Sequence, residues 1–213
     1  MEVTAAEWDG VWVSKGILHR ILNKARAIFT MGLYKKVFKF YLSKSTMLLE
    51  VGCGSSTTSL YLAQYLKGFV GLDFSDEALK ISREKAKELH IKNARLVKGN
   101  AFKMPFKNDS FDVVWSQGLL EHFDNPREIL TEKIRVCKKG GIVITIVPGA
   151  WSFNKLWYVL TRPRLFRNLW PWTEQLFYTK RMLRRLADDT PVKIIRLFYF
   201  HRYGVLIQIM RKR

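Results

Sequence analysis

The stretch LLEVGCGSS, Leu48 to Ser56, decides the fold of this chain. The apolar run Met47 to Val51 predicts a buried strand, and it leads directly into Gly52 and Gly54. The serines and threonines from Ser55 onward can cap a following helix. Together these elements predict a site for a carboxylate or a phosphate. Glycine lets a ligand approach the backbone, and the helix N-terminus offers unpaired N–H groups.

A second apolar run, Phe69 to Leu72, ends at Asp73, nineteen residues after Gly54. An acidic residue at the tip of the second strand of a βαβ unit is placed to accept hydrogen bonds from both ribose hydroxyls of a nucleoside. The dinucleotide fingerprint GxGxxG requires a third glycine, and this chain has Thr57 at that position. The spacing therefore favours a nucleoside ligand other than a dinucleotide.

An acidic residue, Glu50, stands two positions before the first glycine, and this pattern resembles motif I of the class I S-adenosylmethionine-dependent methyltransferases. The family usually carries a third glycine where this chain has Ser56, a small residue that can also cap a helix. The resemblance continues through Gly99 to Phe123, which is similar to the family's segment from strand 3 to the end of strand 4. In all it covers about Met47 to Val147, and the motifs are specific only in combination.

The family often has an acidic residue followed by alanine after strand 3, where this chain has Asn100 and Ala101. The resemblance implies that the side-chain carbonyl of Asn100 accepts a hydrogen bond from the adenine amino group, with Phe102 or Met104 against the ring. Glu121-His122-Phe123 resembles the LEH sequence of the family's small-molecule methyltransferases.

The resemblance implies S-adenosylmethionine as the cofactor and a small molecule as the methyl acceptor. The residues expected to bind the cofactor are Glu50, Gly52, Gly54, Ser55, Asp73, Asn100, Ala101 and Ser116. His122, just past strand 4, is the candidate general base, which is needed only if the acceptor carries a proton at the reacting group. The alternative role for His122 is a helix-start residue bonded to backbone. We expect no metal site, because the two cysteines, Cys53 and Cys137, are distant and no Cys/His cluster accompanies them.

The composition suits one domain with a full core, since nearly half of the 213 residues are apolar. No apolar run reaches the length of a membrane span. The segment Met1 to Gly10 is acidic and polar, unlike a signal peptide. We therefore expect a cytoplasmic protein.

The formal net charge of +19 is concentrated towards the two ends of the chain. Residues 10–49 hold eight Lys or Arg and no acid, residues 50–148 hold fifteen against twelve, and residues 149–213 hold fourteen against three. In the family these ends include the segments that close over the substrate. A basic cover implies an anionic partner: an acidic substrate, the inner membrane face or RNA. The alternative is a solvated Lys-rich surface, as in heat-adapted proteins.

The segment before the C-terminal hairpin carries four tryptophans among arginines. They are Trp151, Trp157, Trp170 and Trp172, with Arg162, Arg164 and Arg167. Three interpretations stay open: a surface on an anionic membrane, a pocket for a long apolar substrate with an acidic group, and core packing. Core packing suits residues 153–160 but explains the mixed Arg and Trp of residues 162–172 less well. We predict that this insert faces the acceptor or an anionic membrane.

The patterning predicts a Rossmann-like α/β fold: a doubly wound, mostly parallel seven-stranded sheet with helices on both faces and an antiparallel C-terminal hairpin. Strands are expected at residues 47–51, 69–73, 94–97, 111–116, 141–147, 191–200 and 205–210, and helices at 18–29, 33–42, 56–67, 75–90 and 125–139. We expect a single domain, 1–213. Its parts are N-terminal basic helices (10–46), a cofactor-binding core (47–148), a substrate-covering insert (149–190) and the hairpin (191–213).

Three functions fit these features. The favoured one is methyl transfer to a small acidic or amphipathic acceptor that resembles a quinone, a phenol or a lipid. Enzymes that methylate base amino groups carry Asn/Asp-Pro-Pro-aromatic after strand 4, where this chain has Ser116-Gln117-Gly118-Leu119. The alternatives are an RNA-binding methyltransferase, less expected without an RNA module, and a membrane-surface protein that keeps the nucleotide fold without catalysis.

Overall fold

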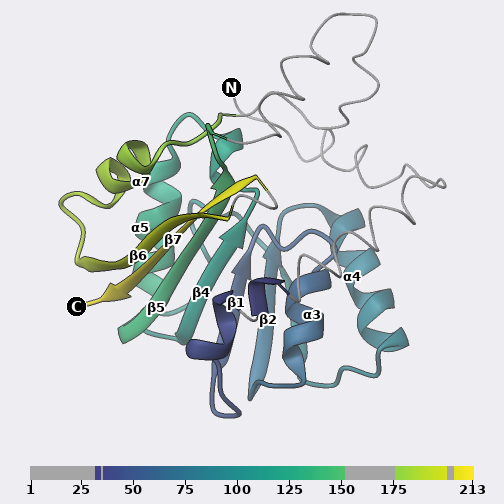
Figure 1. Cartoon of the computed structure of the whole chain (residues 1–213). Coiled ribbons are helices and arrows are strands. Elements are labelled where there is room, and N and C mark those ends of the chain that lie inside the picture. Colours follow the sequence, from purple (N-terminus) through teal and green to yellow (C-terminus); the bar gives the residue numbers. More distant parts are fainter. Residues whose placement is uncertain (1–31, 35, 152–175, 201–203) are drawn as a thin grey trace, which may run out of the picture.

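The computed structural model describes residues 32–34, 36–151, 176–200 and 204–213 (Figure 1). A seven-stranded sheet has the strand order β3-β2-β1-β4-β5-β7-β6. Its strands are β1 (Met47–Val51), β2 (Gly68–Asp73), β3 (Ala94–Lys98), β4 (Phe111–Gln117), β5 (Cys137–Pro148), β6 (Val192–Phe200) and β7 (Val205–Lys212). The helix expected at 18–29 and the Arg-rich part of the insert lie outside the described residues.

The direction of each strand follows from how it is connected. β1 pairs in parallel with β2 and β4, β2 pairs with β3, and β4 pairs with β5. β7 pairs antiparallel with both β5 and β6. Only residues 201–204 separate β6 from β7, and an antiparallel pair needs no long crossover connection. The predicted Rossmann-like sheet with an antiparallel C-terminal hairpin is confirmed.

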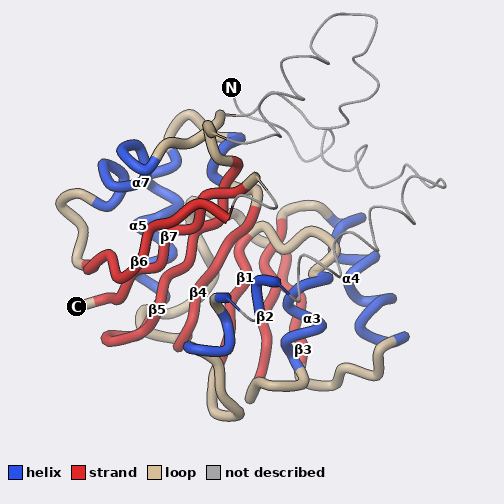
Figure 2. Tube along the Cα trace, viewed as in Figure 1, coloured by secondary structure: helices blue, strands red, loops and turns tan. Residues whose placement is uncertain are grey.

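Helices cover both faces of the sheet (Figure 2). One face carries the 3-10 helix η1 (Phe38–Phe40), α3 (Thr57–Ala63) and α4 (Asp76–Glu88). The other carries α5 (Pro126–Val136) and α7 (Lys180–Ala187). A short 3-10 helix, η2 (Leu120–His122), follows β4. No helix in the described ranges is long and apolar enough to cross a membrane.

The helix predicted at 125–139 is shorter than expected. It ends at Val136, because Cys137 takes an extended backbone and pairs with Phe111 of β4. The glycines Gly140 and Gly141 therefore lie within the irregular start of β5 and do not end a helix.

Two more helices differ in length from the prediction. α3 stops at Ala63, and residues 64–66 form a turn in which the Tyr65 amide donates to the Leu62 carbonyl at 2.8 Å. The helix expected at 33–42 is reduced to helical backbone at residues 32–34 and 36, followed by η1.

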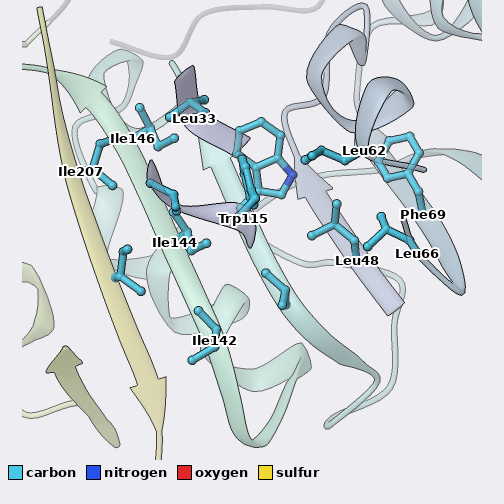
Figure 3. Close-up of a cluster of buried hydrophobic side chains, with 14 of the residues drawn as sticks. Leu33, Leu48, Leu62, Leu66, Phe69, Trp115, Ile142, Ile144, Ile146 and Ile207 are labelled. Atoms are coloured by element: carbon cyan, nitrogen blue, oxygen red, sulfur yellow. The ribbon is translucent and has the colours of Figure 1, made fainter. Parts of the chain in front are cut away.

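The central strands are buried on both faces, as parallel strands covered by helices must be. Successive residues alternate between two apolar clusters. The cluster under η1 and α3 contains Leu48, Phe69, Trp115, Ile144 and Ile207 (Figure 3), and the cluster under α5 and α7 contains Leu49, Val70, Val114, Val143 and Met210. The indole N–H of Trp115 donates to Ser59 Oγ at 3.1 Å, so the polar group of this large core side chain has a hydrogen-bond partner. This core sets the positions of the strand ends that carry the site.

Candidate functional site

The glycine turn lies at the carboxyl end of β1 and is held against β2. The amides of Gly52 and Cys53 both donate to the Leu72 carbonyl, at 2.8 and 3.0 Å. Gly52 has φ +68°, and a Cβ there would lie 2.7 Å from Leu119 Cδ1. Gly54 has φ +49°. Both glycines are therefore required by backbone conformation, and Gly52 also by its contact with the loop after β4.

Asp73, at the carboxyl end of β2, ties this turn to the next helix. Its Oδ2 accepts from the Gly54 amide at 2.7 Å, and its Oδ1 accepts from the Ser75 amide at 3.0 Å. Ser75 caps α4 as predicted, since its hydroxyl accepts from the Ala78 amide at 3.0 Å. A carboxylate can accept about four hydrogen bonds. The structure therefore brings the two residues of the predicted nucleoside site, Gly54 and Asp73, into direct contact.

Ser56 is one of the residues that could cap the helix after the glycine turn, and its side chain does not do so. Ser56 occupies the N-cap position of α3 with φ +50°, and its side chain makes no capping bond. Its hydroxyl instead lies at hydrogen-bond distance, 3.0 Å, from Ser82 Oγ, and the Ser82 hydroxyl donates to the Gly54 carbonyl at 2.7 Å. The left-handed backbone explains why glycine suits this position. The neighbouring Ser55 is buried, with its hydroxyl 3.0 Å from Thr57 Oγ1.

Glu50 is a buried carboxyl beneath the glycine turn. It sits in register between Gly71 of β2 and Trp115 of β4, and its Oε2 has no hydrogen-bond partner among the described residues. Burial raises the pKa of Glu50 to about 8. A hydrogen bond with the Ser59 hydroxyl lowers this pKa in part, and the nearby charge of Asp73 raises it further. An orphaned carboxyl oxygen at this point fits a ligand that brings a hydrogen-bond donor.

The loop after β3 places the predicted adenine residues at the surface. Asn100 is exposed, and its Oδ1 accepts from the Phe102 amide at 2.8 Å. An amide oxygen has a second lone pair, so the bond from Phe102 leaves room for a second hydrogen bond. Adenine recognition by Asn100 stays a prediction. Phe102 is half-buried and meets Phe123 edge-on, with ring centroids 5.1 Å apart. Met104 is 3% exposed and belongs to the core, which leaves Phe102 and not Met104 for the adenine ring.

Ser116 has a partner that the sequence did not suggest. Its hydroxyl accepts from Lys133 Nζ at 2.7 Å, and Lys133 also donates to the Ile144 carbonyl and to Thr145 Oγ1, both at 2.9 Å. Ser116 is 1% exposed, so its side chain faces α5 and not the glycine turn. A cofactor contact of Ser116, if made, must come from its backbone.

Lys133 itself is fully buried without a carboxylate partner among the described residues. Burial lowers the pKa of its ammonium to about 7. The sequence indicates this burial, because Lys133 lies in the apolar stripe that α5 forms with Ile129, Leu130 and Ile134.

η2 places Glu121 and His122 just past β4. His122 is 7% exposed, and its amide donates to the Leu119 carbonyl at 3.3 Å. Its role as general base stays a prediction. Glu121 is 6% exposed, and its Oε2 has no hydrogen-bond partner among the described residues. Burial raises the pKa of Glu121 to about 8.

The loops at the carboxyl ends of four strands therefore meet. Gly54 bonds Asp73, Leu119 packs on Gly52, and the Phe102 ring contacts Phe123. In open α/β sheets ligands bind at these strand ends, so this junction is the candidate site. No cluster of three or more metal-ligating side chains occurs in the part of the chain that the structure describes.

Part of the chain is similar to known methyltransferases. Residues 49–145 match the family model of a methyltransferase domain. The chain is 41% identical over 101 residues to the demethylmenaquinone methyltransferase of Listeria welshimeri, a stretch that is 46% of this chain and 43% of that protein. The chain thus spans about half the length of the curated relatives it matches.

Two solved structures share the fold. A SAM-dependent methyltransferase from Aquifex aeolicus has a TM-score of 0.67 at 17% identity, covering 84% of this chain and 89% of the other. The geranyl diphosphate C-methyltransferase of Streptomyces coelicolor A3(2), in complex with S-adenosyl-L-homocysteine, has a TM-score of 0.65 at 16% identity, covering 89% and 78%.

Proposed function

Since residues 49–145 match the family model of a methyltransferase domain, we propose that the chain is a class I S-adenosylmethionine-dependent methyltransferase that transfers a methyl group from this cofactor to a small amphipathic acceptor of the quinone or phenol class. The observation that carries the proposal is the junction of the glycine turn with Asp73, where the Gly54 amide and the carboxylate are 2.7 Å apart. This junction places the glycine backbone and a carboxylate that can accept from ribose side by side.

In this proposal each predicted residue has one task. Asp73 would bind the ribose hydroxyls, and Asn100 and Ala101 would bind the adenine. The turn from Gly52 to Ser55 would bind the amino-acid part of the cofactor. Beneath this turn, the unpartnered Glu50 Oε2 would accept a hydrogen bond. When bound, the cofactor supplies a methyl group that a nucleophile takes by in-line displacement, while the S–C bonding pair returns to sulfur. The chain then contributes mainly orientation and exclusion of water.

The acceptor class rests on similarity and on surface chemistry. The Listeria welshimeri relative is named a demethylmenaquinone methyltransferase, which supports a quinone-like acceptor. Two described residues of the insert are exposed and apolar: Trp151 is 76% exposed and Leu176 is 46% exposed. Apolar side chains beside the candidate site suit an acceptor with a large apolar part.

Part of the expected basic cover lies on α7. This helix carries four basic residues, Lys180, Arg181, Arg184 and Arg185. None of them takes part in the ion pairs found among the described residues. Such a surface supports an anionic partner. We place an anionic membrane surface ahead of RNA, because an apolar acceptor concentrates in lipid.

Titration calorimetry with S-adenosylhomocysteine tests the cofactor assignment. We expect wild-type protein to bind it and not to bind NAD. Asp73→Ala should weaken binding roughly tenfold to a hundredfold, as for loss of a hydrogen bond to a charged group. Asp76→Ala, three residues further on at an exposed site, is the matched control and should leave affinity unchanged. Wild-type protein without affinity for S-adenosylhomocysteine would refute the proposal.

A further inference from the structure

Glu121 is a buried carboxyl for which the cofactor assignment gives no task. Its side chain is 6% exposed, and Oε2 has no hydrogen-bond partner among the described residues. Burying a polar group without a partner costs free energy, so natural proteins rarely retain one without a function. A ligand that supplies the missing hydrogen bond would account for it.

The surroundings show from which side a ligand can reach this carboxyl. Gly118, at the end of β4, is exposed with φ +63°. A Cβ built on Gly118 would meet nothing within 4 Å except Glu121 Oε1, at 3.6 Å. The Oε1 oxygen of this carboxyl, the neighbour of the unpartnered Oε2, therefore lies next to an exposed stretch of backbone at Gly118.

On its other side, Glu121 adjoins the end of the insert. The Leu176 amide donates to the Glu121 carbonyl at 3.1 Å, and the Tyr178 hydroxyl donates to the Leu120 carbonyl at 3.2 Å. Leu119, two residues before Glu121, packs on Gly52 of the glycine turn. Glu121 thus stands between the turn assigned to the cofactor and the segment that leads out of the insert.

Glu50 differs in this respect, although its Oε2 is also unpartnered. Glu50 lies within β1, flanked in the sheet by Gly71 and Trp115, and is covered by α3. Gln208 Oε1 is the third such oxygen among the described residues, but Gln208 lies within β7, flanked in the sheet by Thr145 and Leu197. Glu121 instead lies in η2, in the loop after β4, and its carbonyl is bonded to Leu176 of the insert.

We propose that Glu121 binds the methyl acceptor by exchanging a hydrogen bond between its carboxyl group and a hydroxyl of the acceptor. This inference rests on the proposed function and names a contact for its acceptor. It makes Glu121 a residue that orients the reacting ring, next to His122 as the candidate general base. The shared chemistry of phenols and hydroquinones, a hydroxyl on an aromatic ring, is what this carboxyl would recognise.

The test separates acceptor binding from cofactor binding and from folding. Glu121→Leu, Glu121→Gln and the control Glu128→Gln, an exposed glutamate of α5, are compared with wild-type protein. S-Adenosylhomocysteine affinity is measured by calorimetry. Methyl transfer from labelled cofactor is measured by mass spectrometry with 2-prenyl-1,4-naphthohydroquinone and a panel of simple phenols.

We expect Glu121→Leu to lower kcat/KM roughly tenfold or more, with S-adenosylhomocysteine affinity within about twofold of wild type. Its Tm should rise, because an unpartnered polar group is replaced by an apolar one. Glu121→Gln, which can still exchange a hydrogen bond, should retain more activity than Glu121→Leu, and Glu128→Gln should match wild type.

Three outcomes overturn the inference: full turnover by Glu121→Leu, a parallel loss of S-adenosylhomocysteine affinity, or a fall in Tm that accounts for the lost activity. A wild-type protein that binds S-adenosylhomocysteine but methylates none of these hydroxyl acceptors also overturns it. Absence of S-adenosylhomocysteine binding in wild type instead refutes the proposed function itself.

Discussion

Replacing Glu50 by glutamine should change how the stability of the protein depends on pH. The burial of Glu50 raises its pKa from the usual 4.5 to about 8. Between these two pH values the folded protein retains a proton that the unfolded chain has released. The free energy of unfolding therefore decreases as the pH rises through this interval, because the folded state binds more protons than the unfolded state.

The size of the effect follows from the interval. One proton changes the free energy of unfolding by about 1.4 kcal/mol for each pH unit. From pH 4.5 to about 8, Glu50 alone should thus remove on the order of 4 kcal/mol. This is a large part of the free energy of unfolding of a typical domain, which is roughly 5–15 kcal/mol. Glutamine has the same shape but no proton to lose, so Glu50→Gln abolishes this contribution.

The assay is urea unfolding, followed by far-ultraviolet circular dichroism, at several pH values from 4.5 to 8. Below the usual glutamate pKa the two proteins should be about equally stable, since Glu50 is then neutral in both states. Towards pH 8 Glu50→Gln should become the more stable protein. Taking the difference between the two curves removes the similar contribution of Glu121, which both proteins keep.

Glu88→Gln serves as the control, because it removes the same charge from the exposed end of α4. Parallel stability curves for wild type and Glu50→Gln would refute the reasoning. They would show that the buried carboxyl of Glu50 is ionised in the folded protein and is stabilised by a group outside the described residues.

Two further predictions concern Asn100 and Lys133. If Asn100 accepts from the adenine amino group, Asn100→Asp should retain or tighten S-adenosylhomocysteine binding and Asn100→Leu should weaken it by about 1 kcal/mol in calorimetry. Indifference to both changes would mean that Phe102 and backbone groups hold the adenine. Burial lowers the pKa of Lys133 from 10.5 to about 7, so between these values the unfolded chain binds the extra proton and wild-type stability should rise with pH. Lys133→Met should lack this rise in urea unfolding, and an unchanged pH dependence would show that the buried ammonium stays charged.

Local sequence determined the strands and the glycine turn, because their signals are short-range. The run Met47 to Val51 is apolar on both faces, and a parallel strand covered by helices needs that pattern. Asp73 follows its strand directly, so its place at a carboxyl end follows from chain order alone. The cap of α4 by Ser75 is likewise a local bond. The proposed domain limits and the roles of the site residues stay predictions.

Tertiary structure decided the partners that come from distant parts of the chain. Ser56 was one of the residues that could cap α3, but the turn imposes a left-handed backbone there and its hydroxyl lies at hydrogen-bond distance from Ser82 of α4. Ser116 was expected at the cofactor, but the alternation along β4 turns its side chain to Lys133 of α5. No local pattern contains these contacts, because each depends on which helix covers which face of the sheet.

The buried carboxyls Glu50 and Glu121 have the same explanation. The spacing to the glycines singles out Glu50 and a resemblance singles out Glu121. Neither pattern shows that an oxygen of each is buried without a partner among the described residues. Sequence therefore determined which residues stand at the ends of the strands. Only the folded sheet, by removing water from those ends, decided which of them have a buried oxygen without a partner among the described residues.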